Sequence, residues 1–479
     1  MIAQLYAVLP EIAILVSACV VLIADLFVPP ARRRISFWLT QAALFVAIWI
    51  VVTTAQLAPV RSFGGMVVDD MLSDVLKLFA LVAVSLMLFY SRAYLAARGL
   101  FRGEMFVLTL FSLLGMMVMM AAANFITLYL GLELMSLSLY ALVALQRDAS
   151  APSEAAMKYF VLGALASGML LYGISMIYGA TGHLDLDRVA DATLGAQGNR
   201  TLLVFGLVFV VSGIAFKLGV VPYHMWVPDV YHGAPTPITL LIGTAPKLAA
   251  FAFTLRVLAG ALKGMEFDWQ GMLIVLSLLS MTLGNLIAIA QTSVKRMLAY
   301  STIANMGFML MGFLAADLNG YSAAMFYTVA YVFTSAASFG VVLLLSREGF
   351  EADAIDDFKG LNRRSPWWAF IMLLVMFSLA GVPPMLGFYA KFAVLEAAVN
   401  QGFVWLAVAG VLASLVGAFY YLRIVKLMYF DEPTDREPIV APGGTRAILS
   451  ANGLALLVLG ILPQPLMGLC VVALAQSQF

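Results

Sequence analysis

The sequence has few charged residues and few of the side chains that hold metals or redox groups. Only 11% of its 479 residues are charged, whereas an average soluble protein carries about 25%. Two cysteines, three histidines and no CxxC pair argue against an iron–sulfur cluster or an ordinary zinc site. No haem or nucleotide motif is present, and a net charge of +1 does not indicate a nucleic-acid partner. We therefore expect no cofactor and no metal to be bound by this chain.

The sequence is instead rich in apolar residues, which make up 63% of the chain. Soluble cores stop growing near about 250–300 residues, so most of this chain must lie in lipid. A spanning helix needs about 20 mostly apolar residues, and this rule predicts fourteen helices, with both termini on the same side. They lie near residues 7–28, 36–58, 71–95, 104–122, 125–145, 155–180, 201–230, 236–257, 270–291, 296–315, 321–345, 367–399, 403–428 and 445–475.

The basic residues of the loops predict an orientation, because cytoplasmic loops carry an excess of Lys and Arg. Five lie on one side, namely Arg61, Arg188, Arg200, Arg256 and Lys263. Seventeen lie on the other, namely Arg32, Arg33, Arg34, Arg92, Arg98, Arg102, Arg147, Lys295, Arg296, Arg347, Lys359, Arg363, Arg364, Arg423, Lys426, Arg436 and Arg446. The second side is predicted to be cytoplasmic, which places both termini outside. The first apolar stretch has no basic leader or cleavage site before it, so we expect a retained helix.

Two of the predicted helices are too long and too broken to be simple spans. Glycines and prolines interrupt 201–230 at Gly219 and Pro222, and 367–399 at Gly381 and Pro384. Interrupted segments in corresponding positions indicate an inverted-repeat transporter; two unrelated proline kinks are the alternative. The fold class predicted is an all-α polytopic membrane protein with two inverted five-helix repeats. The predicted segments are 1–103 (three helices), 104–258 (helices 4–8), 264–430 (helices 9–13) and 444–479 (one helix).

Several ionisable residues fall inside predicted helices. A charged side chain at the centre of a spanning helix costs about 2.5–3.5 kcal/mol and usually marks an ion or proton path. The candidates for a proton path are Glu133, Lys158, Lys217, Lys247 and Lys391, which together would cost roughly 12 kcal/mol or more if they faced lipid. Lys158 lies close to its helix start and could instead extend to the membrane surface.

Lysine suits proton transfer in such a setting. Burial weakens the affinity of an ammonium group for its proton, and a nearby carboxylate strengthens it. A lysine in a wet crevice can therefore be loaded or emptied by moving one counter-charge. His224 is either a relay between the Lys217 and Lys247 helices or a structural donor at a helix end. Lys295 either anchors its helix at the cytoplasmic surface or belongs to the proton path. Asp74 and Lys77 are three residues apart and could pair on one helix face.

Six segments resemble a known family. They are GLELMSLSLYAL around Glu133, MKYFVLGALASG, FKLGVVPYHMWVPDVYHGAPTP, TAPKLAAF, SVKRMLAYSTIANMGF and GVPPMLGFYAKF, in that order along the chain. Together they are similar to the antiporter-like membrane subunits of respiratory NADH:quinone oxidoreductase (complex I), in particular to the subunit N branch, equivalent to mitochondrial subunit 2. Other antiporter-like subunits typically carry a glutamate in the last broken helix, where this chain has Lys391.

The resemblance implies a proton-translocating membrane-arm subunit that couples quinone reduction in neighbouring subunits to outward proton movement. It implies an enzyme only as part of the complex, because NADH, FMN, the iron–sulfur clusters and quinone are bound elsewhere. The partners implied are subunit M, small membrane subunits and the lipid bilayer, in a bacterial inner membrane.

Roles follow from the resemblance by matching position. Glu133 is then the charge partner of the input half, and Lys158 and Lys217 form the switchable pair. Lys247 is the central relay, and Lys391 is the terminal lysine that faces the outlet. Lys295 also matches a family lysine.

Two other functions stay open from the residues. One is a stand-alone multisubunit cation/proton antiporter subunit, in which an ion gradient rather than electron transfer drives exchange. The other is a purely structural membrane subunit, which would have little reason to bury four lysines.

Overall fold

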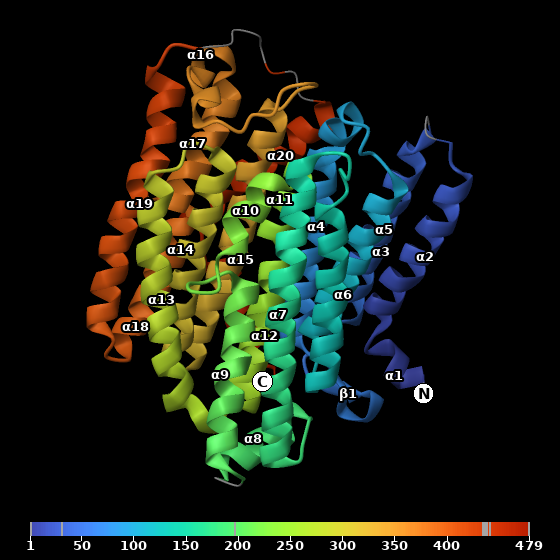
Figure 1. Ribbon diagram of the computed structural model, residues 1–479, viewed down its shortest axis with the longest axis vertical. Coiled ribbons are helices and arrows are strands. Elements are labelled where there is room, and N and C mark those ends of the chain that lie inside the picture. The colour runs from blue at the N-terminus through green and yellow to red at the C-terminus, as the bar shows by residue number, and fades with distance from the viewer. Residues whose placement is uncertain (1, 30–31, 196–197, 434–438, 440–441, 478–479) are drawn as a thin grey trace.

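The computed structural model describes residues 2–29, 32–195, 198–433, 439 and 442–477. Long helices run side by side along the longest axis of the molecule (Figure 1). In the described residues, thirteen helices are long and apolar enough to cross a membrane. The predicted all-α polytopic fold is confirmed. Arg436 lies outside the described residues, so its place in the predicted orientation is not assigned.

The N-terminal part consists of a short helix and three crossings. They are α1 (Ile2–Tyr6), α2 (Leu9–Phe27), α3 (Arg34–Thr54) and α4 (Met71–Ala97). Between α3 and α4 the chain forms an antiparallel hairpin of β1 (Val60–Ser62) and β2 (Val67–Asp69), in which Val60 pairs with Asp69, around the turn η2 (Phe63–Gly65). Asp70 then caps α4 by accepting the N–H of Ser73 at 2.9 Å.

The next part contains the helices predicted as the first repeat. They are α5 (Gly103–Met120), α6 (Phe125–Val143), α7 (Ser150–Thr181), α8 (Leu186–Leu194), α9 (Arg200–Leu218), α10 (Trp226–Gly233), α11 (Thr236–Gly243), α12 (Ala245–Thr254), η3 (Leu255–Ala261) and η4 (Lys263–Met265). The helix α8 lies at one end of the molecule, outside the bundle of crossings (Figure 1).

The remaining helices form the second half. They are α13 (Glu266–Ile289), α14 (Val294–Leu314), α15 (Leu318–Leu345), η5 (Ile355–Phe358), α16 (Leu361–Arg364), α17 (Pro366–Ala380), α18 (Leu386–Asn400), α19 (Val404–Phe430), α20 (Gly443–Ile461) and α21 (Gln464–Ala475). The helices α14 and α15 are buried along almost their whole length and form the centre of this half.

Both predicted broken helices are broken, and in the same way. Gly219 (φ 78°) ends α9 and Gly381 (φ 82°) ends α17, in the left-handed conformation that only glycine adopts without strain. The residue after each glycine donates its N–H to the carbonyl five residues back, and a proline follows each glycine three residues later. In Figure 1 the chain passes from α9 up to α10, but from α17 down to α18. The two breaks are therefore inverted copies of one local structure; the boundaries of the repeats stay a prediction.

Two further predicted spans are divided at prolines. The predicted 236–257 helix changes direction at Thr244 (φ −122°, ψ −98°), just before Pro246. The predicted 445–475 helix is divided into α20 and α21 at Leu462 and Pro463. Proline explains both breaks, because it lacks the N–H that continues a helix and its ring clashes with the preceding turn. With each broken helix counted as one crossing, the described chain crosses fourteen times, as predicted.

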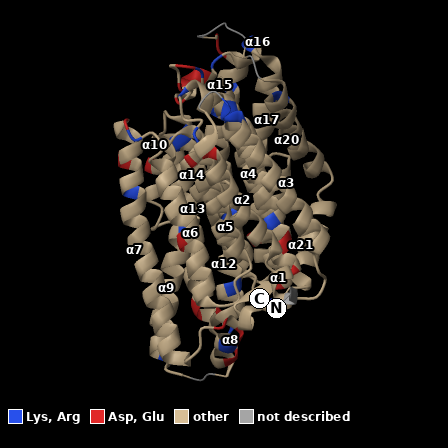
Figure 2. Cartoon of the chain, turned by 90° about the vertical axis from the view of Figure 1, so that its right-hand side faces the viewer, with Lys and Arg blue, Asp and Glu red and all other residues tan. Residues whose placement is uncertain are grey.

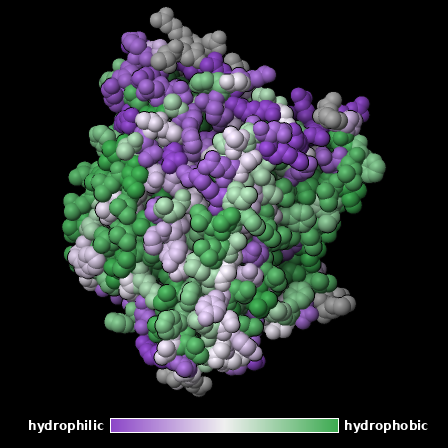
Figure 3. Space-filling model, viewed as in Figure 1, coloured by the Kyte–Doolittle hydropathy of each residue, from purple (hydrophilic) through white to green (hydrophobic). Residues whose placement is uncertain are grey.

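The two termini lie towards the same end of the molecule (Figures 1 and 2). There the N–H of Leu72 donates to the Ser477 hydroxyl at 2.9 Å, which fastens the C-terminal end to the start of α4. The opposite end carries α16, which contains Arg363, and the end of α4 at Arg98, and we call it the basic end. Hydrophilic residues cover the basic end, while hydrophobic residues cover much of the sides below it (Figure 3).

Candidate functional site

The Glu133 carboxylate and the Lys217 ammonium come together between α6, α7 and α9. Lys217 Nζ donates to Ser136 Oγ at 2.7 Å. Ser136 is three residues after Glu133 on α6, so the carboxylate lies on the same helix face and acts on Lys217 electrostatically. Ser167 of α7 donates its hydroxyl to Glu133. The Ser136 hydroxyl itself donates to the Leu132 carbonyl of its own helix, so Lys217 is linked to Glu133 by charge and not by a hydrogen-bond chain of the described residues.

Lys247 is buried at the point where α9 ends. Its Nζ donates to the Leu218 carbonyl at 3.1 Å and lies 5.6 Å from the centre of the Trp226 ring. Leu218 is the last residue of α9 and follows Lys217 directly. The break in this helix thus brings the two lysines to neighbouring positions on the same chain segment.

Lys391 is placed in the same way at the second break. Its Nζ donates to the Leu379 and Ala380 carbonyls at 2.9 and 3.0 Å and to Ser414 Oγ at 3.0 Å. The Phe308 ring centre lies 5.1 Å from this ammonium group. Leu379 and Ala380 are the last residues of α17.

Lys247 and Lys391 are therefore bound in the same way. Each ammonium group binds the free carbonyls at the C-terminus of a half-helix, and neither forms an ion pair with a carboxylate of the described residues. The C-terminus of a helix carries a partial negative charge of about −0.5 elementary charge, which favours a cation there. A buried lysine held by dipoles alone can gain or lose its proton without leaving a full opposite charge unpaired.

Buried polar side chains of α14, α15 and α19 lie beside Lys391. Tyr327 OH donates to Asn305 Oδ1 at 2.6 Å, and Asn305 Nδ2 donates to Ser301 Oγ at 3.2 Å. Ser301 Oγ and Tyr421 OH lie 2.5 Å apart. Asn305, Tyr327 and Lys391 also line a cavity of about 10 Å³, roughly the space that one water needs. The sequence analysis missed these residues, although Ser301 and Asn305 recur at helical spacing in a predicted span.

His224 lies in the segment between α9 and α10. Its Nδ1 is buried and has no hydrogen-bond partner among the described residues. It is thus near the break that carries Lys217 and Leu218, but no direct contact joins it to either lysine in the described structure. The choice between a relay and a structural donor stays open.

Lys158 lies apart from the other lysines. Its side chain is 43% exposed, and Nζ is 2.8 Å from both Glu154 and Asp229. Asp229 also binds Arg296 at 2.9 Å. The structure thus does not bring Lys158 to Lys217 as one pair, and its contacts fit the alternative that it reaches the surface.

Lys295 is buried towards the basic end. Its Nζ donates to the Ala234 carbonyl at 3.2 Å and lies 3.9 Å from Glu351. Nearby, burial raises the pKa of Asp353, but hydrogen bonds from His232 and Ser293 and the charge of Lys295 outweigh it and hold this pKa below its usual range. These contacts join α10 and α14 to the loop after α15, so Lys295 has a structural role there; a place in the path stays a prediction.

A second buried charge cluster lies at the end that carries the termini. Lys77 pairs with Glu11 of α2 at 2.8 Å, not with Asp74 of its own helix, and Arg256 pairs with Asp70 at 2.8 Å. All five side chains are at least nine-tenths buried. Their partners are far apart in the sequence, which is why the spacing along the chain suggested the wrong partner for Lys77.

Comparison with known proteins assigns the family. A family model described as "NADH:quinone oxidoreductase/Mrp antiporter, TM" matches residues 122–417. NADH-quinone oxidoreductase subunit N of Thiobacillus denitrificans (strain ATCC 25259 / T1) is 61% identical over 470 residues, covering 98% of this chain and 97% of that protein. The chain belongs to the subunit N family of NADH-quinone oxidoreductases. A second member of this family, from Nitrosomonas europaea, is 55% identical and covers 98% of the chain and 97% of its own length.

Chains of two solved membrane complexes have a similar fold. A chain of respiratory complex I from Thermus thermophilus with bound aureothin matches with a TM-score of 0.82 and 32% identity, covering 96% of this chain and 98% of that chain. A chain of the Mrp complex from Dietzia sp. DQ12-45-1b matches with a TM-score of 0.86 at 22% identity, covering 99% and 97%. At this low identity, the similarity to the Mrp chain shows only that the fold is shared.

Proposed function

We propose that this chain is a proton-translocating membrane-arm subunit of a respiratory NADH:quinone oxidoreductase. The observation that carries the proposal is the set of three lysines, Lys217, Lys247 and Lys391, at the broken ends of α9 and α17. A structural subunit has no use for ammonium groups at these positions, because each one costs free energy to bury. The subunit N relatives, which match over the full chain, favour this function over a stand-alone antiporter.

The residues support a stepwise transfer. Glu133 favours the charged form of Lys217, and a change in the charge balance around Glu133 would release that proton towards Lys247 across the α9 break. The hydroxyl and amide groups of Asn305 and Tyr327 would then connect the interior to Lys391. We assign Glu133, Lys217, Lys247 and Lys391 to this route, with Lys158, His224 and Lys295 as further candidates.

The setting follows from the same proposal. The complex as a whole uses NADH, FMN, iron–sulfur clusters and quinone, and this chain binds none of them. Its neighbours would be subunit M and small membrane subunits. The membrane would be a bacterial inner membrane, with the basic end in the cytoplasm and both termini on the periplasmic side, in agreement with the positive-inside rule.

The experiment compares transport by the reconstituted complex with single substitutions. Lys217→Ala and Lys247→Ala are expected to leave assembly largely intact while lowering quinone-coupled turnover and NADH-driven proton pumping together. Lys263→Ala is the matched control, because Lys263 is an exposed lysine at the opposite end from the basic end. Wild-type turnover and pumping in both buried-lysine variants would overturn the proton route.

A sodium measurement separates this function from antiport. Proteoliposomes that contain the complex are given NADH and quinone, and both acidification and sodium movement are followed. Proton movement that persists without sodium supports the proposal. Obligatory sodium exchange would support the antiporter instead.

A further inference from the structure

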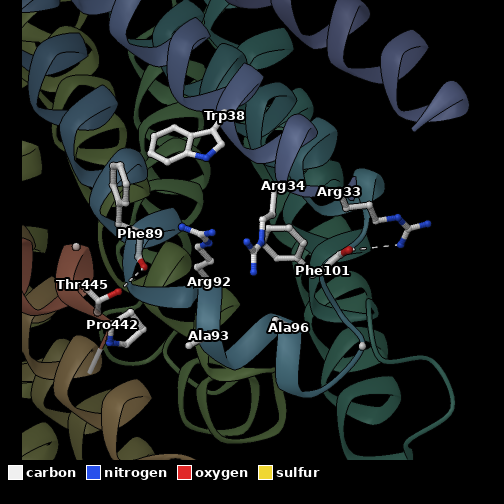
Figure 4. A pocket seen from close by; sticks show the side chains of 12 residues that line it. Arg33, Arg34, Trp38, Phe89, Arg92, Ala93, Ala96, Phe101, Pro442 and Thr445 are labelled. Atoms are coloured by element: carbon white, nitrogen blue, oxygen red, sulfur yellow. Dashed lines mark hydrogen bonds between the residues drawn. The ribbon is translucent and has the colours of Figure 1, made fainter. Parts of the chain in front are cut away.

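A cavity of about 740 Å³ opens at the basic end between α3, α4 and the start of α20. Figure 4 shows the guanidinium groups of Arg34 and Arg92 turned towards this space, with the rings of Trp38 and Phe89 beside it. The Arg33 guanidinium turns away and donates to the Phe101 carbonyl at 3.4 Å. Two positive charges from different helices therefore face one cavity.

The charges in this cavity are not neutralised by the described part of the chain. Within it, neither Arg34 nor Arg92 forms an ion pair with a carboxylate. Arg92 lies 5.4 Å from the centre of the Phe37 ring, which positions the guanidinium group without cancelling its charge. Gly444 and Thr445 of the first turn of α20 line the same cavity, and no side chain caps that helix. Uncapped N–H groups add positive potential, so the cavity suits an anion.

One apolar groove adjoins this cavity, and a second lies one helical turn away from it along α4. The first has a volume of about 330 Å³, shares Arg34 and Trp38 with the cavity, and follows α3. The second, of about 370 Å³, runs between α4 and α20 and is lined by Leu86 and Ile448. Leu86 lies one helical turn before Phe89, which lines the cavity itself. An anion-binding space with two apolar extensions matches a molecule that has one anionic head group and two acyl chains.

We propose that this cavity binds an anionic diacyl phospholipid, with the head group between Arg34 and Arg92. One acyl chain would follow α3 past Trp38, and the other would lie between α4 and α20. Basic pockets between spanning helices on the cytoplasmic side are typical sites for anionic lipid head groups, and tryptophan is enriched at that depth. Such a lipid would join the first crossings to the last one. The site is separate from the buried lysines and does not depend on the proton route.

The test measures lipid binding to the assembled complex. The purified complex is depleted of lipid in detergent and titrated with phosphatidylglycerol, and bound lipids are counted by native mass spectrometry. Arg34→Gln combined with Arg92→Gln is expected to weaken one phosphatidylglycerol site about 25-fold, because each arginine near an anionic lipid contributes about five-fold. If the double variant does not assemble, Arg34→Gln alone, at an exposed position, is expected to weaken the site about five-fold.

Three comparisons make the result decisive. Arg32→Gln is the matched control, because Arg32 is exposed at the same end but does not line the cavity; it is expected to bind phosphatidylglycerol as the wild type does. Phosphatidylethanolamine, which has no net charge, is expected to occupy the site weakly. Inorganic phosphate is expected to compete poorly, because it cannot fill the grooves. Unchanged binding in the arginine variants, an equal loss in Arg32→Gln, or equal competition by inorganic phosphate would overturn the lipid site.

Discussion

The charge of Glu133 offers the sharpest test of the proton route. Glu133→Gln keeps the shape of the side chain and the hydrogen bond from Ser167 but removes the negative charge beside Lys217. The attraction is calculated for a separation of roughly 7 Å between the carboxylate and the ammonium. At an effective dielectric constant of about 20, their attraction is about 2.4 kcal/mol. Removing it lowers the affinity of Lys217 for its proton about fifty-fold.

The expected result is a parallel loss of NADH-driven proton pumping and quinone-coupled turnover, up to about fifty-fold where loading of Lys217 limits the rate. Glu133→Ala should be about as damaging as Glu133→Gln, and Glu133→Asp, which keeps the charge, should be milder. Ser136→Ala should cost about ten-fold or more, because a hydrogen bond from a charged group contributes about 1.5–3 kcal/mol. Ser138→Ala is the control, because within the described part of the chain its hydroxyl donates to the Leu134 carbonyl of the same helix.

A structural role of Glu133 predicts the opposite order. A side chain that only accepts a hydrogen bond from Ser167 would tolerate Gln, which is the same length, and would be damaged by the shorter Asp. The assembled complex with full activity in Glu133→Gln and little in Glu133→Asp would therefore refute the electrostatic argument. The two hypotheses predict opposite orders of activity for Glu133→Gln and Glu133→Asp, so moderate precision in the activity assay is sufficient.

Two further predictions concern buried lysines. Lys77→Met should destabilise the complex by about 3–5 kcal/mol, because Glu11 stays buried without its partner. Adding Glu11→Gln to the same chain should restore most of this loss. Additive losses of stability in thermal unfolding would contradict the ion pair. Gly381→Ala places a Cβ atom 2.9 Å from Lys391 Cδ and should reduce proton pumping. Gly402→Ala is the control, because Gly402 has a similar φ but open space around it. This control should lose only about 1–2 kcal/mol of stability. Equal pumping in these two glycine variants would contradict the argument.

Much of the fold could be predicted because its signals are local. The number of crossings follows from apolar length, and the interruptions of α9 and α17 follow from Gly219 and Gly381 with the prolines after them. The break at Pro463 was not predicted, because an apolar run of sufficient length predicts one spanning helix even where it contains a proline. Hydropathy measures how much of a segment prefers lipid, not whether its backbone is continuous.

The sequence by itself determined that Lys217, Lys247 and Lys391 sit inside spanning segments, since burial of a charge is visible from its apolar surroundings. Only the tertiary structure decided what each ammonium group binds. Lys247 and Lys391 bind the carbonyl ends of half-helices, and Lys158 instead pairs near the surface with Asp229, 71 residues away. Such contacts depend on which helices pack together, and packing joins segments whose separation along the chain carries no information about their distance in space.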